Sequence, residues 1–500
     1  MGARLTSTLL VLAVGLPGLL LYLGSYPGLW LDEGYRMNAA YTMAEDGVYG
    51  TSTLRGHVPF DPGTSTGPLV IAPVALSYRL FGVSAWTTRA PIVLYTIVAL
   101  IALTDLSRRL YGPRIGLFVA LAVLVVGPLR DVGLVWNGRQ LLGEVPGLAF
   151  ALIALLLSLE FWRRERGSLA VLAGLSGSFA LSCKAQYAAV LFVALGTIGL
   201  GRWSSGAARA PAAFAPPVAF VAATLGQRAL EAYLTPADAR AENARMFFEV
   251  LSTDVLPGGW GTQLDTTAFC LFAAMLLIAF VRGREALRSF HSGEAHSLPE
   301  LGIVAGVVAH ALWFGLFSIG WPRYAFAGFA FATILAARFT WDVGAAIALR
   351  LGISWHGRDR LAVAGVASLA LVMNAAPPLL WHTSTGAEEF GAFVRETVPR
   401  EATLESWDWE IDALSGHRRV HHPHQEYLFL AIRRAFLAPP PEAQRDAFQL
   451  GYDPLQADPD YIVSGPFSEW TRIYDRVLNN FRVVAQFGRY RLFERIRDHR

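Results

Sequence analysis

Eleven long runs of apolar residues follow one another through the first 380 positions, and they constrain the fold more than any other feature of the sequence. A helix needs about 20 apolar residues to cross the hydrocarbon core of a bilayer, and a crossing segment must satisfy its backbone hydrogen bonds internally. We therefore predict an α-helical polytopic membrane protein with about 11 transmembrane helices. The predicted segments lie near residues 5–24, 89–107, 114–130, 145–161, 168–182, 187–200, 210–226, 264–281, 300–318, 324–340 and 361–380.

The composition supports this class and excludes several others. Hydrophobic residues make up 54% of the 500 positions and charged residues only 16%, whereas soluble domains carry about a quarter charged residues. The net charge of +3 gives little support for a nucleic-acid partner. Cys183 and Cys270 both lie inside apolar stretches, so we expect neither a disulfide framework nor a cysteine-ligated metal. No cofactor or metal site is predicted, and a need for divalent cations is left open.

Arginine clusters in alternate loops predict the orientation, because cytoplasmic loops carry an excess of basic residues. This pattern places the N-terminus inside and the C-terminus outside, in what we expect to be a bacterial cytoplasmic membrane. No cleavage site follows the first apolar run, so we expect it to be an uncleaved anchor. The clusters comprise Arg108, Arg109 and Arg114; Arg163, Arg164 and Arg166; Arg202 and Arg209; Arg282, Arg284 and Arg288; and Arg350, Arg358 and Arg360.

The composition changes near residue 381 and divides the chain into two predicted parts. Residues 1–380 form the transmembrane module, whose first outward loop, 25–88, contains two amphipathic stretches that we expect to be interfacial helices. Residues 381–500 are polar and include segments 461–464 and 482–484, which have the composition of strands. We predict that this tail is a smaller, mixed α/β extracytoplasmic domain.

The first outward loop holds paired acids, Asp32 and Glu33, directly after the first span, and a further acid, Asp61, in a turn. Acids outside a span can simply be solvated, and that alternative stays open on position alone. The loop and the second span carry further short motifs in a fixed order. These motifs are Phe60-Asp61-Pro62, Gly67-Pro68-Leu69, Leu80-Phe81-Gly82-Val83, Arg89-Ala90-Pro91 and Arg108-Arg109-Leu110-Tyr111-Gly112, followed later by Arg139 to Glu144 with Pro146, Ser182-Cys183-Lys184 and Arg323-Tyr324.

In this order and placement, the motifs resemble those of the GT-C glycosyltransferases that use polyprenyl-phosphate sugars. The pattern is most similar to the protein O-mannosyltransferases and the lipid A aminoarabinose transferase, over roughly residues 1–340. The resemblance implies an integral membrane glycosyltransferase, with a hexosyl or pentosyl donor on a lipid phosphate. Its acceptor would be a lipid, a polysaccharide or a protein outside the cytoplasm. The sequence has no lysine after the loop aspartate, where close relatives often have one.

An inverting displacement at the anomeric carbon needs a carboxylate base and cations for the departing phosphate. Asp32 is the candidate base, with Glu33 orienting the acceptor or tuning the pKa of Asp32. Arg139, Lys184 and Arg323 are the candidates for the donor phosphate, although Lys184, the only lysine, could instead be snorkelling at a helix end. The remaining candidates for substrate binding are Asp61, Thr64, Ser65, Thr66, Glu144 and Tyr324.

The sequence also allows other interpretations. A polytopic transporter or lipid flippase would show inverted hydropathy repeats and charges in the middle of spans, and the sequence shows neither. The run from His421 to His424 could bind a metal, but Pro423 breaks helical ligand spacing, so we expect a loop. Trp407 and Trp409 could stack on sugars, although packing within the tail is the simpler expectation.

Overall fold

The computed structural model describes residues 2–54, 56–59, 66–234, 237, 241, 245, 266–292, 297–318, 320–352, 358–383, 385–424, 427 and 451–496. These residues form two compact units that are each built from separate stretches of the chain. Unit 1 comprises Met1–Leu21, Ile92–Leu234 and Val255–Leu380. Unit 2 comprises Tyr22–Pro91, Thr235–Asp254 and Trp381–Arg500, so the first predicted loop clusters with the C-terminal tail.

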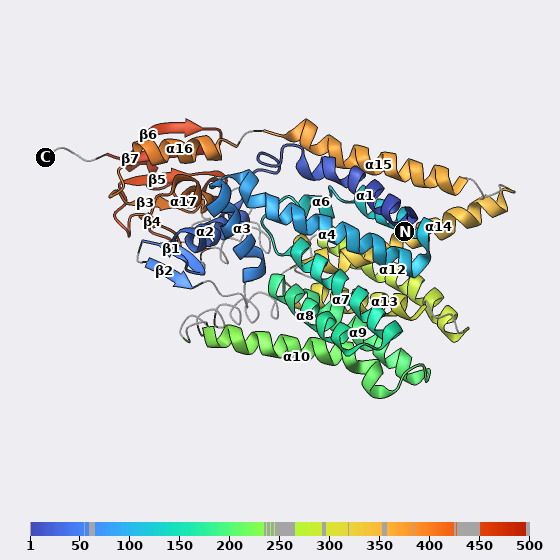
Figure 1. Cartoon of the computed structure of the whole chain (residues 1–500). Helices are drawn as coiled ribbons and strands as arrows, with labels where there is room; N and C mark the ends of the chain where they lie inside the picture. Colours follow the sequence, from blue (N-terminus) through green and yellow to red (C-terminus); the bar gives the residue numbers. More distant parts are fainter. Residues whose placement is uncertain are drawn as a thin grey trace. The chain divides into compact units, whose positions relative to one another are not determined.

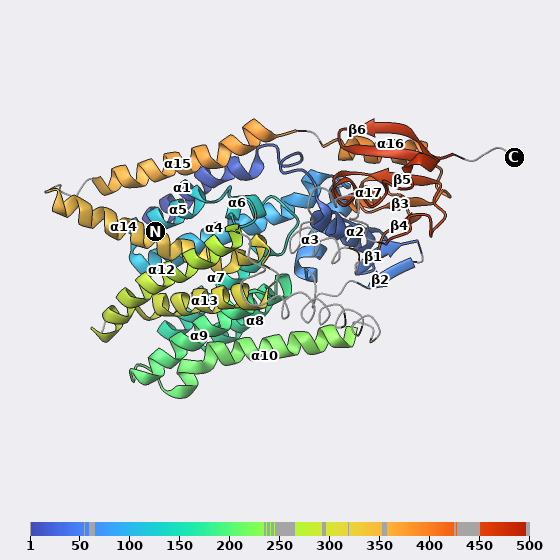
Figure 2. The ribbon, with the colours of Figure 1, turned by 180° about the vertical axis from the view of Figure 1, so that it is seen from behind.

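Unit 1 is helical throughout its described part, and its helices pack side by side along most of their lengths (Figure 1). The neighbours α7, α8, α9 and α13 stay together in the reverse view (Figure 2). The helices are α1 (Gly2–Leu20), α4 (Ala85–Tyr111, from Ile92), α5 (Pro113–Val125), α6 (Leu134–Asn137), α7 (Glu144–Arg164), α8 (Gly167–Cys183), α9 (Tyr187–Ser204), α10 (Ala210–Leu234), α12 (Thr266–His291), α13 (Ser297–Phe317), the 3₁₀ helix η2 (Pro322–Ala325), α14 (Phe326–Arg350) and α15 (Arg358–Trp381).

Each of the eleven predicted segments coincides with one of these helices, which confirms the helical polytopic class. Within the described residues, seven helices are long and apolar enough to cross a membrane, namely α4, α7, α9, α12, α13, α14 together with η2, and α15. The apolar helices α1, α5 and α8 are shorter. The protein is therefore an integral membrane protein.

One end of unit 1 gathers the arginines that the sequence assigns to the cytoplasm. Arg109, at the end of α4, contacts Glu160 near the end of α7 at 3.0 Å. Arg114, at the start of α5, contacts Asp359 at the start of α15 at 2.8 Å. These pairs join helix ends that the orientation pattern places on the same side of the membrane.

Unit 2 combines helices with a five-stranded mixed sheet of order β4-β3-β5-β7-β6. Strand β3 pairs in parallel with β4 and β5, and β7 pairs antiparallel with β5 and β6. The sheet confirms the predicted α/β tail, including strands at 461–464 and 482–484. Its elements are α2 (Leu31–Asp46), β1 (Gly50–Thr53), β2 (Gly56–Pro59), α3 (Pro68–Phe81), α16 (Ala387–Thr397), β3 (Leu404–Ser406), α17 (Glu410–Ser415), β4 (Val420–His421), β5 (Tyr461–Ser464), α19 (Pro466–Thr471), η5 (Leu478–Asn480), β6 (Phe481–Phe487) and β7 (Tyr490–Arg495).

Helix α2 packs against α17, β1 and α3, so much of its surface is covered by protein. A hydrophobic cluster of Leu31, Trp407, Trp409 and Phe467 joins the start of α2 to the tail. The tryptophans are thus packing residues, as the simpler expectation had it. The placement of α2 and α3 at the membrane surface stays a prediction.

The expectation of a loop over residues 421–424 was wrong for His421. This residue ends strand β4, where it lies opposite Glu405 of β3. Glu405, the partner in β3, lies 16 residues earlier in the sequence. A strand of two residues is too short to show a periodic pattern, so the sequence could not reveal this pairing.

Candidate active site

The candidate site residues fall into two groups, one in each unit, and each group is described by itself. Unit 2 contains Asp32, Glu33 and Thr66. Unit 1 contains Arg139, Glu144, Lys184, Arg323 and Tyr324. Asp61, Thr64 and Ser65 lie outside the described residues.

Asp32 stands in the first turn of α2 and retains 23% side-chain exposure. Arg36, one turn further on, donates from Nη1 to the backbone carbonyl of Asp32 at 2.5 Å and lies 3.5 Å from its Oδ1. The same guanidinium donates from Nε to the Thr66 hydroxyl at 2.6 Å. Arg36 therefore brings Thr66 to the candidate base and supplies a cation there, although the first loop has no lysine.

Arg36 is a residue that the sequence interpretation missed. Its spacing of i, i+4 from Asp32 places both side chains on one face of a helix, and that signal was present. The contact with Thr66 could not be derived in the same way, because 30 residues separate the two.

Glu33 is held in a different environment from Asp32. Arg89, in the first turns of α4, donates to both of its carboxylate oxygens, and both side chains are buried. Burial among hydrogen bonds suits a structural ion pair and leaves Asp32 as the more accessible of the two acids.

Unit 1 brings together three charged residues that are far apart in the sequence. Lys184 Nζ lies 3.0 Å from Glu144 Oε1, and Arg323 Nε lies 3.4 Å from the same oxygen. Glu144 begins α7, Lys184 follows the end of α8, and Arg323 lies in η2. The two cations and one carboxylate sum to a net charge of +1.

Aromatic rings flank both cations of this cluster. The Lys184 ammonium is 5.6 Å from the centre of the Tyr324 ring, and the Arg323 guanidinium is 4.5 Å from that of Trp321. Cations over ring faces are stabilised electrostatically, more so when they are desolvated. Tyr324 therefore lies beside the cluster, and its predicted role in substrate binding stays a prediction.

Two further residues fix the backbone of the cluster and were not identified from the sequence. Tyr187 donates from its hydroxyl to the Glu144 carbonyl at 2.6 Å, and its ring passes so close to Gly147 that a Cβ there would lie 2.7 Å from Cδ2. His310 Nε2 lies 3.0 Å from the Tyr324 carbonyl, so it supports the turn that carries Arg323.

Arg139 occupies a different position in unit 1. Its guanidinium is buried and donates to the carbonyls of Gly18 and Leu21, the latter at 2.5 Å. These carbonyls lie at the end of α1, where the last carbonyls lack helical partners. The contacts describe a helix-capping arginine, and its phosphate role stays a prediction.

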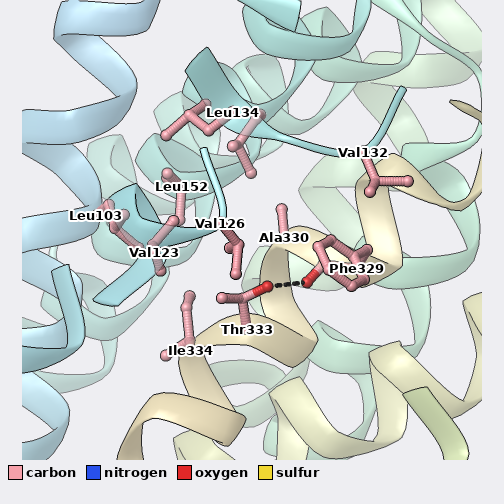
Figure 3. A pocket seen from close by; sticks show the side chains of 11 residues that line it. Leu103, Val123, Val126, Val132, Leu134, Leu152, Phe329, Ala330, Thr333 and Ile334 are labelled. Carbon is pink, nitrogen blue, oxygen red and sulfur yellow. Dashed lines mark hydrogen bonds between the residues drawn. The ribbon is translucent and has the colours of Figure 1, made fainter. Parts of the chain in front are cut away.

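Unit 1 also contains an apolar pocket between α4, α5, α6, α7 and α14, with a cavity volume of about 20 Å³ (Figure 3). Thr333 contributes a hydroxyl to the lining, and this group donates to the Phe329 carbonyl of its own helix at 2.7 Å. Leucine, valine, isoleucine, alanine and phenylalanine form the rest of the wall. A space of this size holds about one water molecule, and its apolar wall offers a sugar or phosphate few hydrogen bonds.

Comparisons with known proteins agree with this architecture. Residues 65–224 match the family model described as dolichyl-phosphate-mannose-protein mannosyltransferase. No curated protein matches the chain.

Solved structures match almost the whole chain. ArnT from Cupriavidus metallidurans bound to undecaprenyl phosphate is 13% identical, with a TM-score of 0.63, and the match covers 98% of this chain and 97% of ArnT. The apo state of ArnT gives 14% identity and a TM-score of 0.64, over 99% and 98% of the two chains. The Archaeoglobus fulgidus oligosaccharyltransferase tethered to an acceptor peptide is 11% identical, with a TM-score of 0.53, over 93% of this chain and 68% of that one. The chain therefore has the fold of the GT-C glycosyltransferase superfamily.

Proposed function

We propose that this integral membrane protein is a glycosyltransferase that moves a sugar from a polyprenyl-phosphate donor to an acceptor outside the cytoplasm. The observation that carries the proposal is the cluster of Glu144, Lys184 and Arg323, of which Glu144 and Arg323 are buried, in a chain with the GT-C fold. Buried charges are costly in a membrane protein, and those that persist commonly bind substrates or ions. The similarity to ArnT bound to undecaprenyl phosphate supports a lipid phosphate as the ligand.

The proposed reaction is a single displacement at the anomeric carbon. The acceptor oxygen bonds to that carbon while Asp32 takes the hydroxyl proton. The bond from the anomeric carbon to the phosphate oxygen breaks, and the polyprenyl phosphate leaves with the electron pair, so the configuration inverts. Lys184 and Arg323 stabilise the charge on the leaving phosphate through charge-assisted hydrogen bonds.

The surroundings of the two groups support these roles. Arg36 donates to the backbone of Asp32, which orients the turn that presents the carboxylate. Transfer with the active site outside the cytoplasm suits a lipid-linked donor, and the chain has no Gly-rich nucleotide-binding fingerprint.

The test uses the purified full-length protein in nanodiscs with a panel of polyprenyl-phosphate hexoses and pentoses and a cell-envelope extract as acceptor. Mass spectrometry follows the released polyprenyl phosphate. We expect one donor to be consumed, and Asp32→Asn to slow its consumption by about 10²–10⁴-fold, the usual contribution of a general base.

Asp46→Asn is the matched control. Asp46 ends the same helix and pairs at the surface with Arg418 at 2.7 Å. This variant should stay within about twofold of wild type, since exposed pairs contribute little. Equal loss in both variants would contradict a base at Asp32. Movement of a labelled lipid across vesicles without donor consumption would favour the flippase alternative.

A further inference from the structure

A continuous set of hydrogen bonds joins α2 to the sheet side of unit 2. Asn38 of α2 donates from Nδ2 to Asp412 Oδ2 of α17 at 2.8 Å. The same Asp412 oxygen lies 2.6 Å from His422 Nε2, and His422 Nδ1 lies 2.6 Å from the Ser406 carbonyl. Asn38, Asp412 and His422 are all buried, so water does not replace these bonds.

The partners determine where the protons are. The backbone N–H of Ser52 donates to Asn38 Oδ1 at 2.9 Å, which fixes that atom as the acceptor and Nδ2 as the donor. The two ring nitrogens of His422 therefore both face acceptors. These are the Ser406 carbonyl and the Asp412 carboxylate, whose Oδ2 already accepts from Asn38. Both nitrogens must donate, and only the imidazolium form carries two N–H groups.

The surroundings of His422 favour this charge. Trp409 stacks on the ring, with centroids 3.6 Å apart and planes 14° apart. Burial alone lowers the pKa of His422, but the Asp412 carboxylate, the Ser406 carbonyl and the charge of Glu405 outweigh it and raise the pKa above 6.5. Asp412 faces the ring from α17 and Glu405 from β3, while Asn38, which is neutral, faces the network from α2.

We propose that the His422 imidazolium is a positioning group for the transfer reaction, because it fixes Asp412, which fixes Asn38 and with it the helix that presents Asp32. This inference rests on the proposed function, in which Asp32 is the base. Asn38 and Asp32 belong to one helix, so a shift at Asn38 moves the carboxylate with it. A misplacement of about 1 Å can reduce turnover by about 10²-fold.

A second contact identifies α17 as the support of α2. Gly34 lies so close to the start of α17 that a Cβ would be 2.8 Å from the Glu410 nitrogen. The two backbones therefore touch one turn below Asn38, and α2 cannot move toward α17 to compensate for a lost hydrogen bond.

The first experiment measures kcat and KM for the donor against pH in wild type, His422→Gln and His421→Gln. His421 is the matched control, since it contacts Glu405 and Tyr452 and, among the described residues, makes no hydrogen bond to α2. Glutamine at 422 can still donate to Asp412, but it cannot bind a second proton.

We expect wild-type kcat to fall as the pH rises through the folded pKa of His422. His422→Gln should lower kcat by about ten- to a hundredfold, leave KM within twofold and lose this alkaline limb. His421→Gln should keep both kcat and the limb. A His422→Gln enzyme with wild-type kcat and an unchanged limb overturns the proposal.

The second experiment needs no activity, so it separates failure of this inference from failure of the proposed function. Hydrogen exchange of residues 31–46, corrected for the intrinsic rate, is followed in the full-length protein from about pH 6 to about pH 9. In wild type, the protection of α2 should fall as the pH rises. In His422→Gln it should be low at every pH, while the protection of α8 stays the same in both proteins. Constant protection of α2 in the wild-type series overturns the proposal even if the variant does not fold.

Discussion

Arg89 donates two parallel hydrogen bonds to Glu33, from Nε at 2.8 Å and from Nη2 at 2.7 Å, and a third from Nη1 to the Leu23 carbonyl at 2.7 Å. The guanidinium thus joins the segment before α2, the first turn of α2 and the first turns of α4. Neither side chain of the ion pair is appreciably exposed. Glu33, the neighbour of the candidate base Asp32, therefore has a structural role, because its ion pair holds the first loop in place.

Breaking this pair from either side should destabilise unit 2. Glu33→Gln or Arg89→Met leaves a buried charge without its partner, and such losses amount to about 3–5 kcal/mol. Replacing both by methionine should restore much of the stability. Unfolding in detergent, followed by tryptophan fluorescence, measures the effect.

Arg482→Met is the control for that series. Arg482 makes the same kind of contact with Glu494 at 2.6 Å, but its side chain is 71% exposed. Its loss should amount to at most about 1 kcal/mol. Equal destabilisation in Arg482→Met and Arg89→Met would contradict the importance of burial.

Lys184 is the cation whose removal should affect the donor most directly. Lys184→Met keeps the apolar stem but loses the charge beside Glu144, so donor affinity and turnover should each fall. Charge-assisted hydrogen bonds amount to about 1.5–3 kcal/mol, or roughly one to two decades. Lys184→Arg should recover part of the loss, because the charge survives in a different geometry.

Donor binding to the purified variants decides between this role and a snorkelling lysine. Arg130→Met serves as the control, since Arg130 is 81% exposed and pairs only loosely with Asp131, at 3.8 Å. Binding and transfer by Lys184→Met within twofold of wild type would remove Lys184 from the site.

The apolar runs predicted the helices because bilayer thickness fixes the length of a crossing segment. The eleven helices that match the runs begin within about four residues of the predicted starts, whereas α10, α12 and α14 extend well beyond the predicted ends. The order of motifs also selected Glu144, Lys184, Arg323 and Tyr324, which unit 1 brings together.

The partners of these residues could not be predicted in the same way. Periodicity reports which residues share a face of one element, whereas Arg89 and Glu33 are 56 residues apart and Asn38 and Asp412 are 374 apart. Arg139 was selected as a phosphate ligand because its motif fitted and because it falls at a predicted outer membrane end, but its guanidinium donates to backbone carbonyls of α1 and of the residue after it. A motif spacing does not reveal which carbonyl a guanidinium will meet.

Glu410 should make the stability of unit 2 depend on pH in the opposite sense to an ordinary carboxylate. Burial, and then the charge of Asp408, raises the pKa of Glu410 from 4.5 to about 8. The folded chain therefore keeps a proton that the unfolded chain loses above pH 4.5, and the stability from this group falls as the pH rises from 4.5 to about 8.

Glu410→Gln has no such proton to lose. Relative to wild type it should gain stability steadily across this pH range and level off above it. Tm values of the two proteins at a series of pH values provide the test. Parallel curves would show that Glu410 is already ionised in the folded protein.

Gly34→Ala should disrupt the packing of α2 against α17 through a steric clash. The new methyl group would lie 2.8 Å from the Glu410 nitrogen, which is closer than a carbon can approach a backbone atom. Gly196→Ala in α9 is the control, because nothing lies within 4 Å of its Cβ position and alanine favours a helix by roughly 1 kcal/mol. We expect a lower Tm and lower turnover in the first variant only, measured side by side.

The orientation can be tested by reporter fusions. Arginines join the ends of α4 and α7 and the starts of α5 and α15, which are the ends assigned to the cytoplasm. A periplasmic reporter should be active when fused after Trp381 and inactive when fused after Arg166. The reverse pattern would place both candidate groups on the wrong side for a lipid-linked donor facing outward.

The hydrogen bond between Asn38 and Asp412 also sets an order of events during synthesis. The ribosome adds about 5–20 residues per second, so the 374 residues between these partners take roughly 20–75 s to make. Throughout that interval α2 has been synthesised without α17, against which it packs in the folded protein. A nascent or prematurely terminated chain therefore lacks the partner of α2, and this part of unit 2 assembles only when translation is nearly complete.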